Sequence, residues 1–415
     1  MSPEKAQLQY LERYAEPEIH ALEGLDIRRY AHCLVIPAHR EPPESLIQVW
    51  PHADPGLLMI VVVNSWDSTD RISQLMLQNL TREPAQQSGH LHYIHGSARP
   101  DLIIVDRCLP GRLIPRRQGV GLARKIGADV ALALICSGAI ESPLINSTDA
   151  DVVLPNNYFD TPAPALSTAA ILQPFHHYFA AELELASKLY DISMYYYVRG
   201  LRYAGSGYAF HTIGSTLRIN AKHYAQVRGF PKRNAAEDFY ILNKLAKTGQ
   251  IEINPGAAIR IQARLSDRAP FGTGPALQTI SSLAAPITDY AFYDPRVFHM
   301  LRIFLATAEQ LRNQDPEICF RQTPEILNWL NHAGLRQLLG QQRRSLKPVF
   351  QRFLRDWFDG FQTLKFIHFM RDQYFPSMSL DSICDGTVLP EAHIQNLEAV
   401  RWLHRALTEE PDPGL

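Results

Sequence analysis

The sequence predicts an α/β fold in which a mostly parallel central sheet is flanked by helices and followed by a helical C-terminal region. The run Leu57–Asn64 is apolar, β-branched and unalternating, which is typical of a parallel strand buried on both faces. A shorter apolar run, Cys33–Glu41, precedes it, and the segment between the two has helical character, so the order indicates a βαβ unit. Beyond about Asp289 the pattern is that of helices alone.

The other elements follow in chain order. Apolar residues at helical spacing predict a leading helix and a connection within residues 1–30. Further strands are expected at Asp101–Asp106, Pro143–Val152, Gly214–Asn220 and Ile253–Asp267, and helices at Pro42–His52, Gly119–Ala139, Ala169–Tyr203 and Ala235–Gly249. We therefore expect a helical lead over 1–30, a catalytic domain over 31–288 and a helical region over 289–415.

Composition narrows the class of protein. Lys and Arg number 41 against 42 Asp and Glu, a net charge of −1, so no global charge favours nucleic acid as a partner. The five cysteines are scattered without a C-x-x-C pair, which argues against a disulfide framework and a zinc site. The charged N-terminal stretch lacks the apolar core of a signal peptide, and the apolar runs are too short to span a bilayer. We expect a cytoplasmic protein, with peripheral membrane contact and the oligomeric state left open.

Two carboxylates one residue apart, Asp149 and Asp151, stand at the end of the expected strand Pro143–Val152. Hard oxygen ligands at such a position suit Mg²⁺ or Mn²⁺, which can bridge to a diphosphate. Ligands of open α/β sheets bind at the carboxyl ends of the strands, which favours this interpretation. The alternative is a solvated turn or a helix cap.

A second acidic pair, Glu237 and Asp238, stands near the start of an expected helix. Such a pair can supply a general base that deprotonates a hydroxyl. Acidic residues in a first helical turn are also ordinary partners of the helix dipole, so this alternative stays open.

Basic residues gather around Gly119 and Gly121, where a helix is expected to begin. Arginines beside a helix start suit a phosphate-bearing ligand, although a solvated loop explains them equally well. The group comprises Arg112, Arg116, Arg117, Arg124 and Lys125. A later loop carries Arg264 and Arg268 and is a candidate lid or acceptor-binding segment.

In this order, the motifs resemble those of family 2 glycosyltransferases with the GT-A fold, over roughly residues 30–275. The matching segments are VIPAHRE (Val35–Glu41), VVVNSWDSTD (Val61–Asp70), GLARKIGAD (Gly121–Asp129), NSTDAD (Asn146–Asp151) and Gly214–Gly249. The resemblance implies a nucleotide-diphosphate sugar donor, an acceptor of unknown identity and a bound Mn²⁺ or Mg²⁺.

The resemblance also implies roles for individual residues. Asp149 would approach the ribose, Asp151 would ligate the metal, and Asp238 with Glu237 beside it would be the catalytic base of an inverting transfer. Gly214 opens the segment that resembles the acceptor region. The residues implied for nucleotide contacts are Pro37, His39 and Glu41 at base and ribose, Asn64 and Asp67 near the base, and Arg124 near the base or diphosphate.

Three other functions remain to be weighed. A retaining transferase acting on a small acidic acceptor is the runner-up, because Arg264 and Arg268 could hold such an acceptor. A nucleotidyltransferase normally needs a glycine-rich, arginine-bearing loop after the first strand. This chain reads PAHREPPES there, which counts against that activity. A catalytically silent sugar-nucleotide-binding protein is disfavoured by the presence of both acidic pairs.

Overall fold

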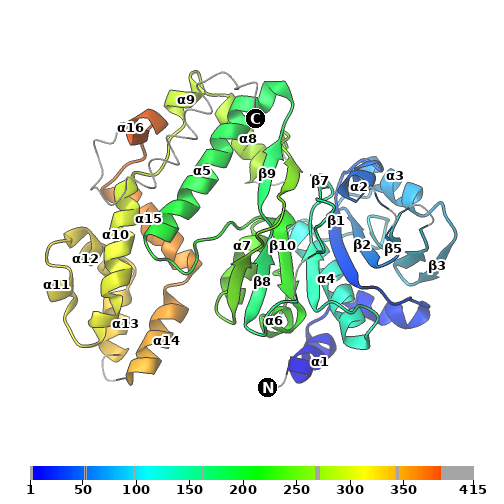
Figure 1. The fold of residues 1–415 in the computed structure, drawn as a ribbon, viewed down its shortest axis with the longest axis horizontal. Coiled ribbons are helices and arrows are strands. Elements are labelled where there is room, and N and C mark those ends of the chain that lie inside the picture. Colours follow the sequence, from blue (N-terminus) through cyan, green and yellow to red (C-terminus); the bar gives the residue numbers. More distant parts are fainter. Residues whose placement is uncertain are drawn as a thin grey trace. The chain divides into compact units, whose positions relative to one another are not determined.

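The computed structural model describes residues 3–50, 52, 54–96, 99–160, 163–266, 272–342 and 345–384. They form two compact units, which we describe separately (Figure 1). The sheet unit contains the described residues of Met1–Tyr178 and Thr212–Gln262. The helical unit contains those of Phe179–His211, Ala263–Asp267 and Gly272–Leu415.

A nine-stranded sheet in the order β11-β8-β10-β6-β1-β2-β5-β4-β3 forms the centre of the sheet unit. Its strands are β1 (His32–Ala38), β2 (Leu57–Asn64), β3 (Ala85–Ser88), β4 (Leu91–Ile94), β5 (Asp101–Arg107), β6 (Leu144–Ser147), β8 (Thr168–Leu172), β10 (Leu217–Asn220) and β11 (Gln250–Ile253). Only β4 and β10 pair antiparallel with their neighbours on both sides, so the other seven strands point the same way. The predicted mostly parallel α/β sheet is thus confirmed.

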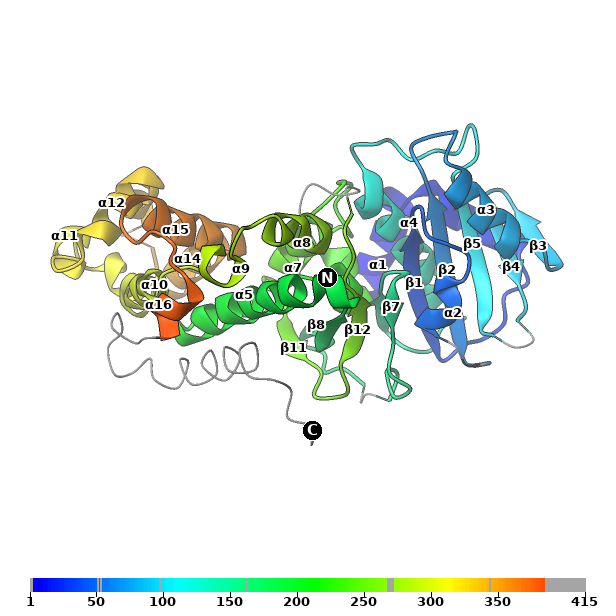
Figure 2. The same cartoon turned by 90° about the horizontal axis from the view of Figure 1, so that it is seen from above.

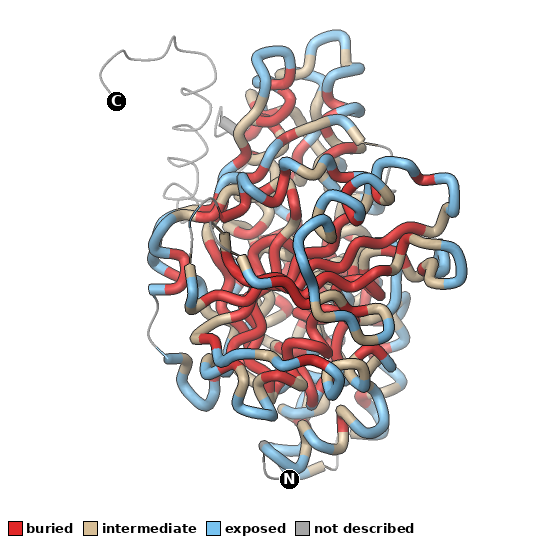
Figure 3. Tube along the Cα trace, turned by 90° about the vertical axis from the view of Figure 1, so that its right-hand side faces the viewer, coloured by how far each residue is buried: buried red, intermediate tan, exposed pale blue. Residues whose placement is uncertain are grey.

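Helices flank this sheet (Figure 2). Those of the sheet unit are α1 (Pro3–Arg13), α2 (Ser45–Val49), α3 (Arg71–Leu80), α4 (Gly119–Ser137), α6 (Ala221–Gln226) and α7 (Glu237–Leu245). Every residue of β2 is buried, as its unalternating apolar run predicts, and α4 packs on β1 and β2. Figure 3 shows buried segments in red and exposed ones in pale blue along the chain. A Cβ on Gly127 of α4 would lie 2.4 Å from Val35 Cγ1, so a glycine permits this close approach.

The expected helix at Ala169–Tyr203 is wrong in its first part. Residues Thr168–Leu172 form β8, and Phe175–Tyr178 form β9, which belongs to a small sheet in the order β7-β12-β9 with β7 (Val152–Val153) and β12 (Ile259–Gln262). The sequence of β8, TAAIL, is buried throughout and therefore lacks the alternation that marks a strand with one exposed face.

The N-terminal segment belongs to the sheet unit and is held there by a buried polar network. Asp129 of α4 is fully buried and accepts hydrogen bonds from Tyr10 at 2.6 Å and from Tyr224 at 2.7 Å. Lys125 Nζ lies 2.8 Å from Asp129 Oδ2 and 2.8 Å from the Tyr14 carbonyl oxygen. The network joins α1, α4 and α6, which is why residues 1–30 do not stand apart.

The helical unit is built around aromatic side chains. The Trp329 ring centroid lies 5.2 Å from that of Phe304 and 4.8 Å from that of Phe366, and all three are buried. Its helices are α5 (Glu184–Tyr203), α8 (Thr273–Ser281), α9 (Pro286–Asp289), α10 (Pro295–Thr307), α11 (Pro316–Cys319), α12 (Pro324–His332), α13 (Leu335–Gln342), α14 (Lys347–Trp357), α15 (Gly360–Gln373) and α16 (Leu380–Cys384). Within the described ranges, no helix combines the length and apolar character that crossing a bilayer requires.

The two units do not follow chain order, because α5 packs with α8 and α10 of the helical unit. The predicted functional boundaries at 1–30, 31–288 and 289–415 stay a prediction.

We expect Asp129→Ala to lower the free energy of unfolding of the sheet unit by about 3–5 kcal/mol, because it leaves the Lys125 ammonium buried beside the hydroxyl of Tyr10 without its nearest carboxylate. Urea denaturation would measure the loss. As a control, Glu184→Ala breaks an exposed i,i+4 pair with Lys188 and should cost about 0.3–0.5 kcal/mol. Equal effects of the two substitutions would contradict the assigned role of the network.

Candidate functional site

Polar residues collect where β1, β2 and β6 reach their carboxyl ends. His39 and Arg40 follow β1, Asn64 is the last residue of β2, and Asp149 comes shortly after β6. These three strands are parallel, so their carboxyl ends share one edge of the sheet. This is the edge at which open α/β sheets bind ligands.

The guanidinium of Arg124 holds two predicted site segments together. Its Nε donates to Glu237 Oε1 at 2.8 Å and its Nη2 to Asp149 Oδ1 at 2.5 Å. Its Nη1 donates to Ser147 Oγ at 3.0 Å. Burial works against the charge, but the carboxylates of Asp149 and Glu237 outweigh it and hold the pKa of Arg124 above its ordinary value. Three predicted site residues therefore form one ion-paired group.

The acidic pair Glu237 and Asp238 begins α7, directly after Ala236, whose φ of 59° is in the left-handed region. Glu237 is buried and pairs with Arg124. Asp238 Oδ1 accepts from the backbone N–H of Phe239 at 2.7 Å. Burial, together with the neighbouring Glu237 carboxylate, raises the pKa of Asp238 to about 7. A carboxyl group with this pKa can accept and release a proton near neutral pH.

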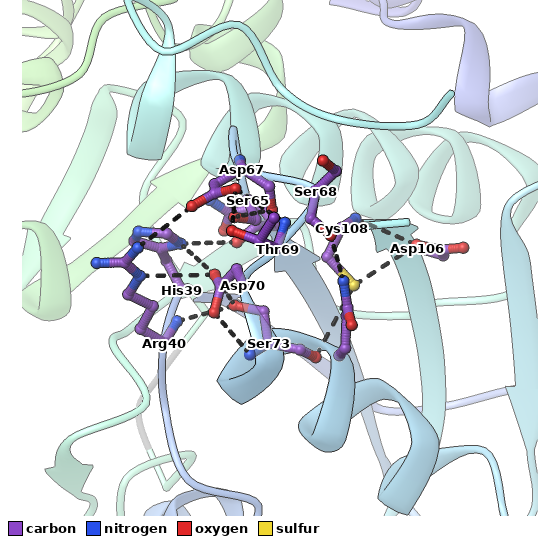
Figure 4. Close-up of polar contacts among 12 residues, drawn as sticks. His39, Arg40, Ser65, Asp67, Ser68, Thr69, Asp70, Ser73, Asp106 and Cys108 are labelled. Carbon is purple, nitrogen blue, oxygen red and sulfur yellow. Dashed lines mark hydrogen bonds and ion pairs between the residues drawn. The ribbon is translucent and has the colours of Figure 1, made fainter. Parts of the chain in front are cut away.

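A second polar group surrounds His39 at the ends of β1 and β2 (Figure 4). His39 Nδ1 lies 2.9 Å from the Asn64 carbonyl oxygen and 3.7 Å from Asp70 Oδ2. Arg40 Nη2 lies 3.8 Å from Asp67 Oδ2, and Arg40 Nε lies 3.7 Å from Asp70 Oδ2. Arg40 has a φ of 54°, so its backbone adopts a conformation uncommon for a residue with a side chain.

Asp70 also starts α3, where its side chain accepts from the Ser73 backbone N–H at 3.2 Å and from the Ser73 hydroxyl at 2.8 Å. Burial opposes its ionisation, but these hydrogen bonds outweigh it and keep the pKa of Asp70 below its ordinary value. Asp67 is held by Thr69, whose N–H and hydroxyl donate to Asp67 Oδ1 at 2.8 and 2.7 Å. These bonds lower the pKa of Asp67. Both carboxylates are thus fixed as anions.

Sequence reasoning missed three members of this group: Arg40, Trp66 and Asp70. The Trp66 ring lies 4.2 Å from the His39 ring, centroid to centroid, and Arg40 lies 6.0 Å from the Trp66 centroid. Asp70, three residues before Ser73, has the spacing of an N-cap, a signal that was available in the sequence. The approach of Trp66 to His39 depends on the pairing of β1 with β2 and carries no local signal.

Four other predicted site residues are buried or closely packed. Pro37 is buried within β1, and Glu41 is buried in the loop after it. Asn64 is 2% exposed, and its Oδ1 has no hydrogen-bond partner among the described residues. A Cβ on Gly214 would lie 2.3 Å from Arg124 Nη2, so Gly214 leaves room for that guanidinium.

The basic residues predicted to gather around the start of α4 do not form one cluster. Lys125 belongs to the buried Asp129 network, and Arg112 Nη1 lies 2.6 Å from Asp106 Oδ2. Gly121 N donates to the Arg233 carbonyl oxygen at 2.8 Å, so the chain just before α7 packs on the first turn of α4. Arg116 and Arg117 are exposed. The two glycines of this turn thus serve a close backbone approach.

Candidate lid residue Arg264 belongs to the helical unit, and Arg268 lies outside the described residues. Their predicted role as a lid or acceptor-binding segment stays a prediction.

The predicted metal ligands Asp149 and Asp151 flank the buried Ala150. Asp149 is paired with Arg124. Within the described part of the chain, no three His, Cys, Asp or Glu side chains are grouped so as to hold a metal ion. The described residues therefore offer no preformed cage, and a cation bound by Asp149 and Asp151 would need further ligands from a bound phosphate group and water.

Among the solved structures, 41 chains match this one, and the match described here is of low similarity. No protein-family model matches the chain, and no curated protein has a significant sequence match. One match is a mannosyltransferase from Pyrobaculum calidifontis, solved in complex with GDP-Man and Mn²⁺. The alignment includes 97% of this chain and 90% of the mannosyltransferase chain. Its sequence identity is 12% and its TM-score is 0.32. At this identity and TM-score, the match does not indicate the activity or the ligands of this chain.

We expect Gly214→Ala to displace the Arg124 guanidinium and to lower the free energy of unfolding by about 1–3 kcal/mol, as overpacking of a filled interior does. Gly207→Ala is the matched control, because nothing lies within 4 Å of a Cβ there, and it should change stability by less than about 0.5 kcal/mol. Chemical denaturation of both variants would compare them. A neutral Gly214→Ala would contradict the close contact.

Proposed function

We propose that this chain is an inverting, metal-dependent glycosyltransferase of the GT-A type, which moves a sugar from a nucleotide-diphosphate sugar to an acceptor hydroxyl. The observation that carries the proposal is the joined group of Arg124, Asp149, Glu237 and Asp238 at the ligand-binding edge of the sheet. This group supplies a base with a pKa near neutrality beside a buried cation, and its Asp149 stands next to Asp151, with which it is proposed to bind the metal.

Asp238 is proposed as the general base. Single displacement requires a group that takes the proton of the acceptor hydroxyl as its oxygen attacks the anomeric carbon. Glu237 is committed to its 2.8 Å ion pair with Arg124, whereas the pKa of Asp238 is raised to about 7. We therefore assign proton transfer to Asp238, as the sequence resemblance implies, and a positioning role to Glu237.

The donor half of the proposed site lies at the ends of β1 and β2. Trp66 and His39 offer ring faces on which a nucleobase can stack. The buried Oδ1 of Asn64, which has no hydrogen-bond partner in the described part of the chain, can accept a hydrogen bond from a base or ribose donor, and this would satisfy an otherwise costly buried acceptor. Arg40, 40% exposed at its side chain, is a cation available beside them for a phosphate oxygen.

Asp151, with Asp149 beside it, is proposed to hold Mg²⁺ or Mn²⁺. Two carboxylates plus donor phosphates and water form a common ligand set for such ions. The bound ion would supply charge neutralisation for the departing nucleoside diphosphate. Arg124 would keep Asp149 in place through the 2.5 Å bond and contribute a second fixed positive charge.

Replacement of the proposed base tests the catalytic assignment. Asp238→Asn should lower the turnover of the donor sugar nucleotide by about 10²–10⁴-fold with little change in donor affinity. Asp26→Asn, at an exposed position, is the control and should retain full activity. Wild-type activity in Asp238→Asn, or a product with retained anomeric configuration, would contradict the proposed mechanism.

The pH profile gives an independent test. Only deprotonated Asp238 can act as a base, so turnover should rise as the pH rises through about 7 and then level off. At pH 6 it should be about one tenth of the plateau. The rate should be measured from pH 5 to 9 with saturating donor; a rate already at its plateau at pH 5 would exclude Asp238 as the base.

A binding screen tests the donor site apart from catalysis. The melting temperature would be measured with UDP, GDP and their sugars in the presence of Mn²⁺, since ligands that bind the native state raise it. We expect one nucleotide class to stabilise the wild type, and Asp151→Ala to weaken that response while the exposed-site control Asp160→Ala retains it. No response to any nucleotide by folded protein would contradict the transferase proposal. Binding without turnover across many acceptors would favour a silent sugar-nucleotide-binding protein.

A further inference from the structure

Arg218 is a cation enclosed within the sheet unit and away from any carboxylate that pairs with it among the described residues. It stands on β10 and is 1% exposed. Its Nε donates to Asn146 Oδ1 at 2.9 Å, and its guanidinium carbon lies 5.2 Å from the centroid of the Tyr158 ring. Burial lowers the pKa of Arg218 below its ordinary value. A buried charge without a counter-charge is unfavourable, so this arrangement needs a compensating partner.

Each of these two contacting side chains has one hydrogen-bonding group without a partner among the described residues. They are Arg218 Nη1 and the hydroxyl of Tyr158, a residue that is 0% exposed. Both can donate a hydrogen bond. Beyond Tyr158 lies the Phe159 ring, 4.9 Å away between centroids. Buried polar side chains in native proteins nearly always have partners, so a ligand that accepts hydrogen bonds would complete this one.

We propose that Arg218 and Tyr158 form an internal binding site for one small inorganic anion of the size of chloride or bromide. The positive guanidinium sets the charge of the ligand, and the two donors set its hydrogen-bonding character. Because both side chains are at most 1% exposed, the ligand is enclosed, which favours a monoatomic ion over a phosphate or an organic acid.

The site would have a structural consequence for the D-x-D segment. Asn146, which holds Arg218, stands in β6 three residues before Asp149, and Tyr158 stands in the segment that follows Asp151. An anion bound by both Arg218 and Tyr158 would therefore link β10 to the segment that follows the D-x-D motif. This inference does not rest on the proposed transferase activity.

The test is the melting temperature of the full chain in chloride, bromide and gluconate at one ionic strength. Gluconate serves as the reference because it is too large for an enclosed site. Chloride and bromide should raise the melting temperature along a saturating curve, by about 3 °C at a tenfold excess over Kd. Equal melting temperatures in the three salts would overturn the proposal.

Variants locate the effect. Arg218→Met should abolish the chloride response without loss of the native fold, because it removes the buried charge and retains much of the volume. Arg260→Met is the matched control: Arg260 also lies over a tyrosine, 4.9 Å from the Tyr178 centroid, but is exposed, and this variant should keep the response. A full response in Arg218→Met would overturn the site. If that variant does not fold, Tyr158→Phe decides, since the proposal requires a weaker chloride affinity and an unchanged affinity would refute it.

Discussion

The arrangement of the proposed active site depends on the burial of a single guanidinium. Arg124 is 2% exposed. It joins its own helix, α4, to two other segments: the end of β6 with Asp149, and the start of α7 with Glu237. A buried arginine is stable only if carboxylates and hydrogen-bond acceptors surround it in good geometry. That requirement fixes where β6 ends and α7 begins relative to α4. Gly214 and Gly121 are glycines because neighbouring groups approach too closely for a side chain.

The same constraint separates the chemistry of two adjacent carboxyl groups. Glu237 spends its charge on Arg124, and its presence in turn makes a second negative charge on Asp238 unfavourable. Of this acidic pair next to a single cation, Glu237 is engaged in the ion pair, while burial and the neighbouring carboxylate raise the pKa of Asp238 to about 7. In the donor half, His39 lies near Asp70 and Asn64, while hydrogen bonds from Thr69 and Ser73 favour ionised Asp67 and Asp70.

The sequence was informative where one strand or helix carries its own signal. The bounds of β2, Leu57–Asn64, follow from an uninterrupted apolar run, and the helix at α4 follows from a long apolar stretch that ends at Gly138 with a φ of 78°. The sequence is less informative where burial on both faces removes the alternation of apolar and polar residues. In β8 its pattern predicts a helix, although the segment forms a strand. For the site, the order of acidic and basic motifs indicated Arg124, Asp149 and Glu237, but not that they form one ion-paired group. The contact between Arg124 and Glu237 joins residues 113 positions apart in the sequence, and the approach of the Trp66 ring to His39 likewise depends on the register of the sheet.

The position of β10 has a consequence for biosynthesis. β10 lies between β6 and β8 and pairs with both, yet the chain reaches it only after α5 of the helical unit has been made. As the polypeptide leaves the ribosome, β6 therefore presents an unpaired edge until Leu217–Asn220 emerges, and β8 has no paired neighbour, because its other partner β11 comes later still. Exposed edges of this kind recruit other strands, so the nascent chain passes through a stage that is prone to aggregation. Interruption of translation between these points would release a fragment in which β6 lacks one neighbour and β8 lacks both, the kind of species that chaperones must shield.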